Sequence, residues 1–115
     1  MPERRQRLAA EIQDVVAACL GTLSDPRLGF VSVVRTEVSR DLAVADVYVS
    51  VLGDEEAWAS SAKALRSATS LIRRKVAERV QLRKAPEVRW KMDPSLVNSQ
   101  RIDRLLSEIH RREQP

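Results

Sequence analysis

The chain has 115 residues, the length of one small domain, which excludes an enzyme built from two domains. Its 20 Lys and Arg against 16 Asp and Glu give a formal net charge of +4, and its hydrophobic fraction of 43% is ordinary for a globular protein. Only four side chains are aromatic, which argues against nucleic-acid binders that stack bases on several exposed rings. We therefore expect residues 1–115 to fold around one core.

The cysteine and charge patterns exclude several other classes. Cys19 is the single cysteine, and no Cys/His cluster has the spacing of a zinc site, so we expect no disulfide, metal or cofactor. The longest run without a charged residue, 15–24, is about half of what a bilayer span requires. Glu11 and Asp14 interrupt the apolar core that a signal peptide needs. These features predict a cytoplasmic protein that makes no membrane contact.

Basic side chains are concentrated in one part of the chain. Residues 63–91 contain ten Lys and Arg against two acidic residues, whereas the remainder contains ten basic and 14 acidic residues. This asymmetry is typical of proteins that bind a polyanion. The alternative is a solvated helix face that happens to be rich in arginine.

The first expected element is a helix from Arg4 to Ser24, because its apolar residues recur at steps of three and four. The pair Asp25-Pro26 ends this helix, since a residue before proline is pushed out of helical geometry. Cys19 lies on the apolar stripe, so we assign it to the core rather than to catalysis.

A β-hairpin is expected next. Valine-rich runs at residues 31–39 and 42–52 flank the turn-prone pair Arg40-Asp41. The second run alternates cleanly between apolar and polar residues, as a half-buried strand does. In the first run the alternation is disturbed at Val33-Val34, which suggests a β-bulge.

Helical spacing returns from Glu55 to about Gln81. Ala68-Thr69-Ser70 is the weakest helical point, because Thr and Ser compete for backbone hydrogen bonds, and the periodicity leaves open whether the helix breaks there. Cations opposite the apolar side fall within an arc of about 100°; they are Lys63, Arg66, Arg73 and Arg74.

Strict alternation from Glu87 to Met92 predicts a third strand. Trp90 is an inward-facing residue of this alternation, so we assign it to the core rather than to a stacking platform. An apolar stripe predicts a last helix from Ser99 to Arg112. The elements together predict an α+β fold.

No catalytic constellation is apparent. His110, the single histidine, lies beside two arginines near the end of the last expected helix, and no base partner for a serine or cysteine nucleophile is present. The three glycines cannot form a phosphate-cradling P-loop. We expect a protein that is not an enzyme.

Several spaced motifs, in order from about Arg4 to Ile109, resemble those of the bacterial ribosome-binding factor A family. The resemblance implies a type II KH-like domain in which helices pack on one face of a three-stranded sheet. The implied order is helix-strand-strand-helix-helix-strand plus a C-terminal helix. The motif residues are Asp25-Pro26-Arg27-Leu28-Gly29, Val38-Ser39-Arg40-Asp41-Leu42, Ala45, Val47-Tyr48-Val49, Asp93, Ser95 and Leu96.

The resemblance also implies a function. Family members bind the small ribosomal subunit through its ribosomal RNA and assist late maturation without catalysis, including processing of the RNA 5′ end, and they are associated with cold adaptation. Maturation GTPases are further expected partners, and nothing in the sequence demands more than a monomer. Two alternatives stay open: a general nucleic-acid-binding KH-like protein, and a protein–protein adaptor whose basic face docks a maturation GTPase.

The expected RNA-binding site combines the basic block with the helix junction. The family has an Ala-x-Gly kink, and the equivalent here is Ala68-Thr69-Ser70, with serine in place of glycine. If the helix breaks there, Thr69 or Ser70 would cap the second segment and its free N–H groups would face outward. With few aromatic residues, binding should read RNA shape and backbone. The predicted residues are Lys63, Arg66, Ala68, Thr69, Ser70, Arg73, Arg74, Lys75, Arg79, Arg83 and Lys84.

Overall fold

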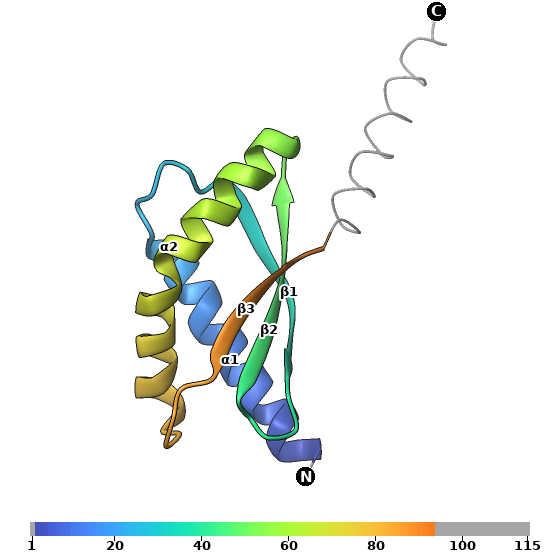
Figure 1. Ribbon diagram of the computed structural model, residues 1–115, viewed down its shortest axis with the longest axis vertical. Helices are drawn as coiled ribbons and strands as arrows, with labels where there is room; N and C mark the ends of the chain where they lie inside the picture. Colours follow the sequence, from blue (N-terminus) through green and yellow to red (C-terminus); the bar gives the residue numbers. More distant parts are fainter. Residues whose placement is uncertain (1, 94–115) are drawn as a thin grey trace, which may run out of the picture.

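The computed structural model describes residues 2–93, and the predicted last helix lies outside the described residues. The observed order is helix, strand, strand, helix, strand, which confirms the expected α+β fold (Figure 1). The elements are α1 (Pro2–Thr22), β1 (Phe30–Val38), β2 (Val44–Leu52), α2 (Glu55–Val80) and β3 (Glu87–Met92).

The three strands form one mixed sheet with β2 in the centre. β1 pairs with β2 in antiparallel orientation, whereas β3 pairs with β2 in parallel, because α2 carries the chain back across the sheet before β3 begins. The register between β1 and β2 shifts between Val33 and Arg35, which confirms the predicted bulge. An extra residue in β1 therefore explains the disturbed alternation at Val33-Val34.

The turn between β1 and β2 is built by Ser39 and Asp41. The Ser39 hydroxyl donates to Asp41 Oδ1 at 2.7 Å and accepts from the Val44 backbone N–H at 3.0 Å. Asp41 Oδ1 also accepts from the Ala43 backbone N–H at 3.1 Å. These hydrogen bonds lower the pKa of the Asp41 carboxyl, that from Ser39 most strongly. Such side-chain bonds to nearby backbone groups are typical of tight turns.

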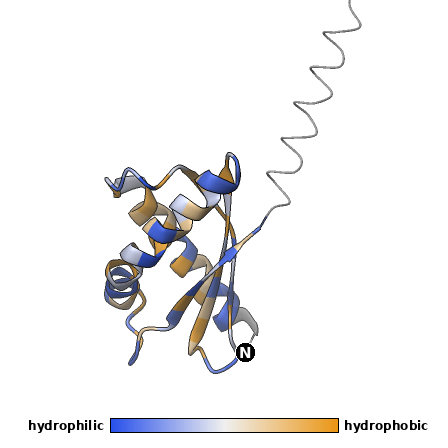
Figure 2. Cartoon of the chain, turned by 45° about the horizontal axis from the view of Figure 1, so that its top comes forward, coloured by the Kyte–Doolittle hydropathy of each residue, from blue (hydrophilic) through white to orange (hydrophobic). Residues whose placement is uncertain are grey.

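Both helices cover the same face of the sheet, and the core lies between them. The inward residues of the central strand, among them Val47 and Val49, are fully buried and belong to one hydrophobic cluster with residues of both helices. Ile12 of α1 and Leu65 of α2 are likewise inaccessible to solvent. Figure 2 shows the hydrophobic colour gathered where helices and sheet face one another.

The two helices that the resemblance implies for this region form one helix in the structure, which answers the question that periodicity left open. α2 is one helix of 26 residues that continues through Ala68-Thr69-Ser70, although it changes direction near its middle (Figure 1). Thr69 Oγ1 donates to the Leu65 carbonyl oxygen at 2.8 Å, and this type of bond bends helices without interrupting them. Trp90 Nε1 of β3 donates to the same hydroxyl oxygen at 2.9 Å. Trp90 packs against the core, as predicted.

The start of α2 is fixed by its capping residue and by a glycine. Asp54 is the N-cap, and its Oδ1 accepts from the Ala57 backbone N–H at 2.9 Å. Gly53 has a φ of +139°, a conformation that favours glycine. A Cβ at Gly53 would lie 2.7 Å from Ala57 Cβ, which is too close for two carbon atoms. The sharp entry into α2 therefore requires a glycine.

This geometry predicts opposite outcomes for two Gly→Ala substitutions. Gly53→Ala should lower the free energy of unfolding by about 1–3 kcal/mol, because alanine is strained at this φ and clashes with Ala57. Gly21→Ala is the matched control: it lies within α1 with no atom near the added Cβ, so stability should stay constant or rise by up to about 1 kcal/mol. Urea denaturation measures both, and equal stability of the two variants would contradict the strained entry.

Candidate nucleic-acid interface

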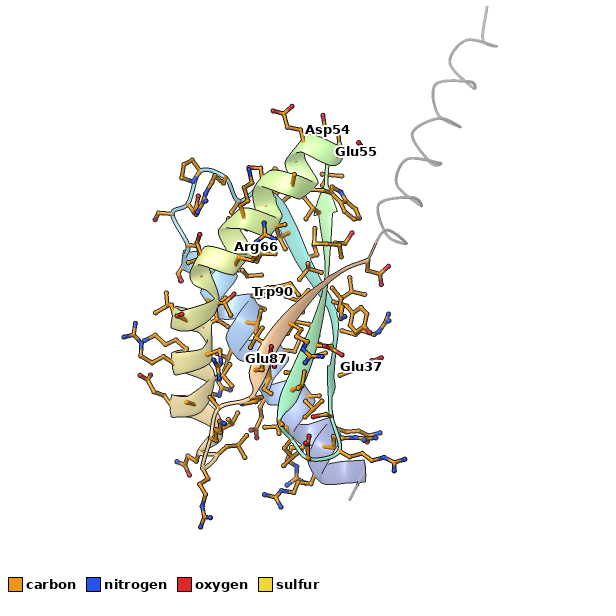
Figure 3. All side chains as sticks on the ribbon, viewed as in Figure 1. Glu37, Asp54, Glu55, Arg66, Glu87 and Trp90 are labelled. Carbon is orange, nitrogen blue, oxygen red and sulfur yellow. The ribbon has the colours of Figure 1, made fainter. Side chains whose placement is uncertain are left out.

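The outward side of α2 carries an exposed row of cations. Lys63, Arg66 and Arg74 are all exposed, with the exposed residues Ser67 and Ser70 between them, and we call these five residues the basic ridge. Their steps of three and four bring them to one side of the helix. Figure 3 labels Arg66 in the middle of α2. Among the described residues, the three cations take part in no ion pair, so their charges are available to a ligand.

The basic ridge has a defined direction along α2. The first turn of the helix contains Glu55 and Glu56 and follows Asp54, so the helix begins acidic and becomes basic from Lys63 onward (Figure 3). Acidic groups at the start of a helix interact favourably with the helix dipole. They would also repel a polyanion, so only the part of α2 from Lys63 onward suits a phosphate backbone.

Arg73 does not share the exposure of its neighbour Arg74. Its guanidinium group is partly buried and donates from Nε to the Pro86 carbonyl oxygen at 3.1 Å and from Nη2 to the Ala85 carbonyl oxygen at 3.3 Å. Arg73 therefore fastens the loop before β3 to α2. A contact between Arg73 and RNA stays a prediction.

The remaining predicted cations lie apart from the basic ridge. Lys75 pairs with Glu78 at 3.9 Å, and its charge acts on the Cys19 thiol, whose pKa is raised mainly by burial and lowered in part by Lys75. Arg79 is in the last turn of α2. Arg83 and Lys84 line an open pocket of about 670 Å³ between the hairpin turn and the loop before β3. The predicted basic block is thus split between one helix side and one loop.

The junction residues do not provide the expected helix cap. Ala68 and Thr69 are half-buried, and the hydroxyl of Thr69 is used by Leu65 and Trp90. Because α2 is continuous, no free N–H groups face outward at this point. Only Ser70 of the three is exposed. Binding by this segment stays a prediction, and it would have to use side chains on the basic ridge.

Arg27 is not among the site residues predicted from the sequence. The structure nevertheless places Arg27 against the basic ridge. Its Nη2 donates to Ser67 Oγ at 3.0 Å and to Asp25 Oδ2 at 2.6 Å, and its Nε donates to Asp25 Oδ1 at 3.0 Å. The motif Asp25-Pro26-Arg27-Leu28-Gly29 was the available signal, because its residues fix a loop that reaches α2.

The Asp25–Arg27 pair persists over the physiological pH range. Hydrogen bonds from Arg27 lower the pKa of the Asp25 carboxyl to about 2. Since this pKa lies below the ordinary value of 3.8, the interaction is complete above that value and is lost only as the pH falls towards about 2. The orientation of Arg27 is therefore independent of pH near neutrality.

The face of the sheet opposite the helices carries charges that are mostly paired. The Arg35 guanidinium lies 3.9 Å from the centre of the Tyr48 ring and also pairs with Glu37 at 3.3 Å and with Asp93 at 3.4 Å. Arg89 pairs with Glu87 at 3.5 Å. Arg35 occupies one face of the Tyr48 ring, so this face is closed to a base. The α2 side is therefore the better candidate interface.

The described residues contain neither a metal site nor a membrane-spanning helix. Within residues 2–93, no group of three or more His, Cys, Asp or Glu side chains is arranged to hold a metal ion. In the same part of the chain, no helix combines the length and apolar character needed to cross a membrane.

Comparisons with known proteins point to one family. The sequence model of ribosome-binding factor A matches residues 4–106. A solution structure of a putative ribosome-binding factor A from Thermotoga maritima is 39% identical, covers 76% of this chain and 85% of its own, and has a TM-score of 0.70. The crystal structure of ribosome-binding factor A from Thermus thermophilus is 28% identical, with 76% and 93% coverage and a TM-score of 0.68.

A third similar structure is described in a ribosomal complex. It is a homology model of the Thermus thermophilus factor, fitted into a cryo-EM map of a complex between that factor and the 30S subunit. It is 28% identical to this chain, covers 78% of this chain and 96% of its own, and has a TM-score of 0.65.

Substitution of the adjacent residues Arg73 and Arg74 should affect the free energy of unfolding to different extents. Arg73→Gln removes the donor to two partly buried carbonyl groups and should lower the free energy of unfolding by about 1–3 kcal/mol. Arg74→Gln, at an exposed position, should change it by no more than about 0.5 kcal/mol. Thermal denaturation of the two variants makes the comparison, and an equal effect would show that Arg73 does not fasten the loop.

Proposed function

Because the chain belongs to the ribosome-binding factor A family, we propose that it binds the small ribosomal subunit through ribosomal RNA and assists late maturation of the subunit, including processing of the RNA 5′ end. The family match over residues 4–106 and the similarity to a factor described in a 30S complex support this proposal. The protein acts by binding, with no catalytic step assigned to its own residues, and the fold serves as a KH-like module.

The basic ridge is the observation that carries the proposal for how the RNA is bound. Within residues 2–93, Lys63, Arg66 and Arg74 form no ion pair, and they lie along one side of α2. Because α2 rises about 1.5 Å per residue, these cations extend over about 16 Å, enough to contact several phosphate groups of an RNA backbone. The planar guanidinium groups of Arg66 and Arg74 suit bidentate contacts with phosphate oxygens.

The mode of recognition follows from what lies next to the basic ridge. Trp58 donates its Nε1–H to the Val51 carbonyl oxygen at 2.9 Å, and Trp90 donates to Thr69, so both indole rings are held within the fold. Arg35 covers one face of the Tyr48 ring on the opposite side of the sheet, and Phe30, at the start of β1, is the one aromatic side chain of the described residues that is largely exposed. From Lys63 to Arg74, the exposed side chains on α2 are cations and hydroxyls. Such a surface reads the shape and backbone of structured RNA rather than the identity of bases.

Reversal of charge on the basic ridge tests this function. The double variant Arg66→Glu, Arg74→Glu should weaken binding to free small subunits at least tenfold and make the affinity less dependent on salt, because two phosphate contacts become repulsive. The matched control is Arg40→Glu with Arg4→Glu, which reverses two exposed charges on other elements and should leave the affinity within about twofold. Co-sedimentation with purified small subunits at several salt concentrations measures both.

Four outcomes would contradict all or part of the proposed function. Equal affinity for unrelated duplexes and for small subunits at physiological salt would indicate a general nucleic-acid binder. Association with a GTPase that survives nuclease treatment, without subunit binding, would indicate a protein adaptor. Sedimentation of the parent protein only with complete ribosomes, never with free or immature small subunits, would exclude a role in subunit maturation. Normal 5′ ends of the small-subunit ribosomal RNA in a strain that lacks the protein would contradict a role in processing of these ends.

A further inference from the structure

The loop between α1 and β1 is fastened along the first half of α2 (Figure 1). The Ser60 hydroxyl donates to the Arg27 carbonyl oxygen at 2.7 Å, and the Gly29 backbone N–H donates to the Ser61 hydroxyl oxygen at 3.1 Å. The third bond joins Arg27 Nη2 to Ser67 Oγ at 3.0 Å. Since the three serines extend over about two helical turns, the loop cannot slide along α2 without losing several bonds.

Within this loop, the guanidinium group of Arg27 is oriented by Asp25. One edge of the planar group, Nε and Nη2, faces the Asp25 carboxylate with donor–acceptor distances of 3.0 Å and 2.6 Å. The backbone N–H of Arg27 also donates to Asp25 Oδ1 at 2.9 Å. The side chain of Arg27 is nevertheless 45% exposed. The remaining nitrogen, Nη1, has two N–H groups and no hydrogen-bond partner among the described residues.

Two other donors lie next to Arg27 on the basic ridge. Ser67 accepts a hydrogen bond from Arg27, so its hydroxyl proton remains available for a ligand. Lys63 is four residues before Ser67 and three after Ser60, and residues at these steps are neighbours on a helix surface. Ser60 and Ser67 both contact Arg27, which places Lys63 on the same side of α2 as the guanidinium group. Arg27, Ser67 and Lys63 therefore present donors on the same exposed side of α2.

We propose that Arg27, Lys63 and Ser67 form a binding site for one phosphate group of the RNA backbone, with Asp25 as the residue that positions Arg27. The inference rests on the proposed function and extends the interface from α2 to the α1–β1 loop. A phosphate group fits these donors because its oxygen atoms accept several hydrogen bonds and its negative charge is attracted by Lys63 and Arg27. The contribution of Arg27 is a directed hydrogen bond, because Asp25 offsets part of its charge.

The orientation of Arg27 is fixed before the ligand arrives. A free arginine side chain loses rotamer entropy when it binds, whereas Arg27 is already held by Asp25 and Ser67. Lysine could not reproduce this arrangement, because one ammonium group cannot pair edge-on with Asp25 and also present two further N–H groups, as Nη1 of Arg27 does, to a phosphate. The site therefore depends on the shape of the guanidinium group as well as on its charge.

The experiment compares charge-matched variants of the full chain by titration against purified small subunits at several salt concentrations. Arg27→Gln should weaken binding about three- to tenfold and make the salt dependence shallower, because a phosphate contact is lost. Arg27→Lys should lose most of the same affinity. The control Arg40→Gln removes an exposed charge at the hairpin turn, at the opposite end of β1 from Arg27, and should bind like the parent.

A reference variant separates this inference from the proposed function. Arg66→Gln tests the basic ridge alone, and the melting temperature of each variant confirms folding. If Arg66→Gln weakens binding while Arg27→Gln binds like the parent, the phosphate site is wrong and the proposed function stands. If both bind like the parent, the proposed interface itself fails.

Three other results would also overturn the phosphate site. Full affinity of Arg27→Lys would show that only charge matters at this position. A loss of affinity in Arg27→Gln without a change in salt dependence would indicate that Arg27 merely supports the loop. Unchanged subunit affinity in Arg27→Gln, together with loss of binding to an acidic partner protein, would assign the site to a protein ligand.

Discussion

The Thr69 hydroxyl group joins α2 to β3, because it donates to the Leu65 carbonyl oxygen within α2 and accepts from Trp90 of β3. A straight helix of 26 residues would extend about 39 Å and would reach past the nine-residue central strand, which extends about 30 Å. The bond to Leu65 bends the helix and the bond from Trp90 ties the bend to the sheet. The direction of the basic ridge depends on this arrangement.

The bend explains how α2 can be both a core element and a binding surface. Leu65, Ile72 and Val76 are fully buried along one side of the helix. Lys63, Arg66 and Arg74 occupy the other side and remain exposed on both sides of the bend. On the opposite face of the molecule, ion pairs neutralise much of the charge. The α2 side and the opposite face of the sheet therefore differ in charge for two reasons. They carry different numbers of charged side chains, and more of the charges on the sheet are paired.

Tertiary packing changed the roles that the sequence predicts for two arginines, Arg73 and Arg27. Arg73 follows the basic pattern of α2, but its guanidinium group satisfies two carbonyl groups of the loop before β3. Arg27 is distant in sequence from the basic block, but hydrogen bonds to Ser60 and Ser67 bring it against α2. Periodicity places a residue on a side of its own helix and contains no information about which loop packs there.

Local patterns in the sequence determined the order of the described elements, the bulge at Val33-Val34, the hairpin turn at Arg40-Asp41, the burial of Val47 and the packing of Trp90 against the core. These features depend on the alternation of side chains and on hydrogen bonds between residues close in the chain. Only the tertiary structure decided that α2 stays continuous at Thr69, because the deciding partner, Trp90, is 21 residues away. It also decided which arginines are free to bind, since that depends on contacts between elements remote in sequence.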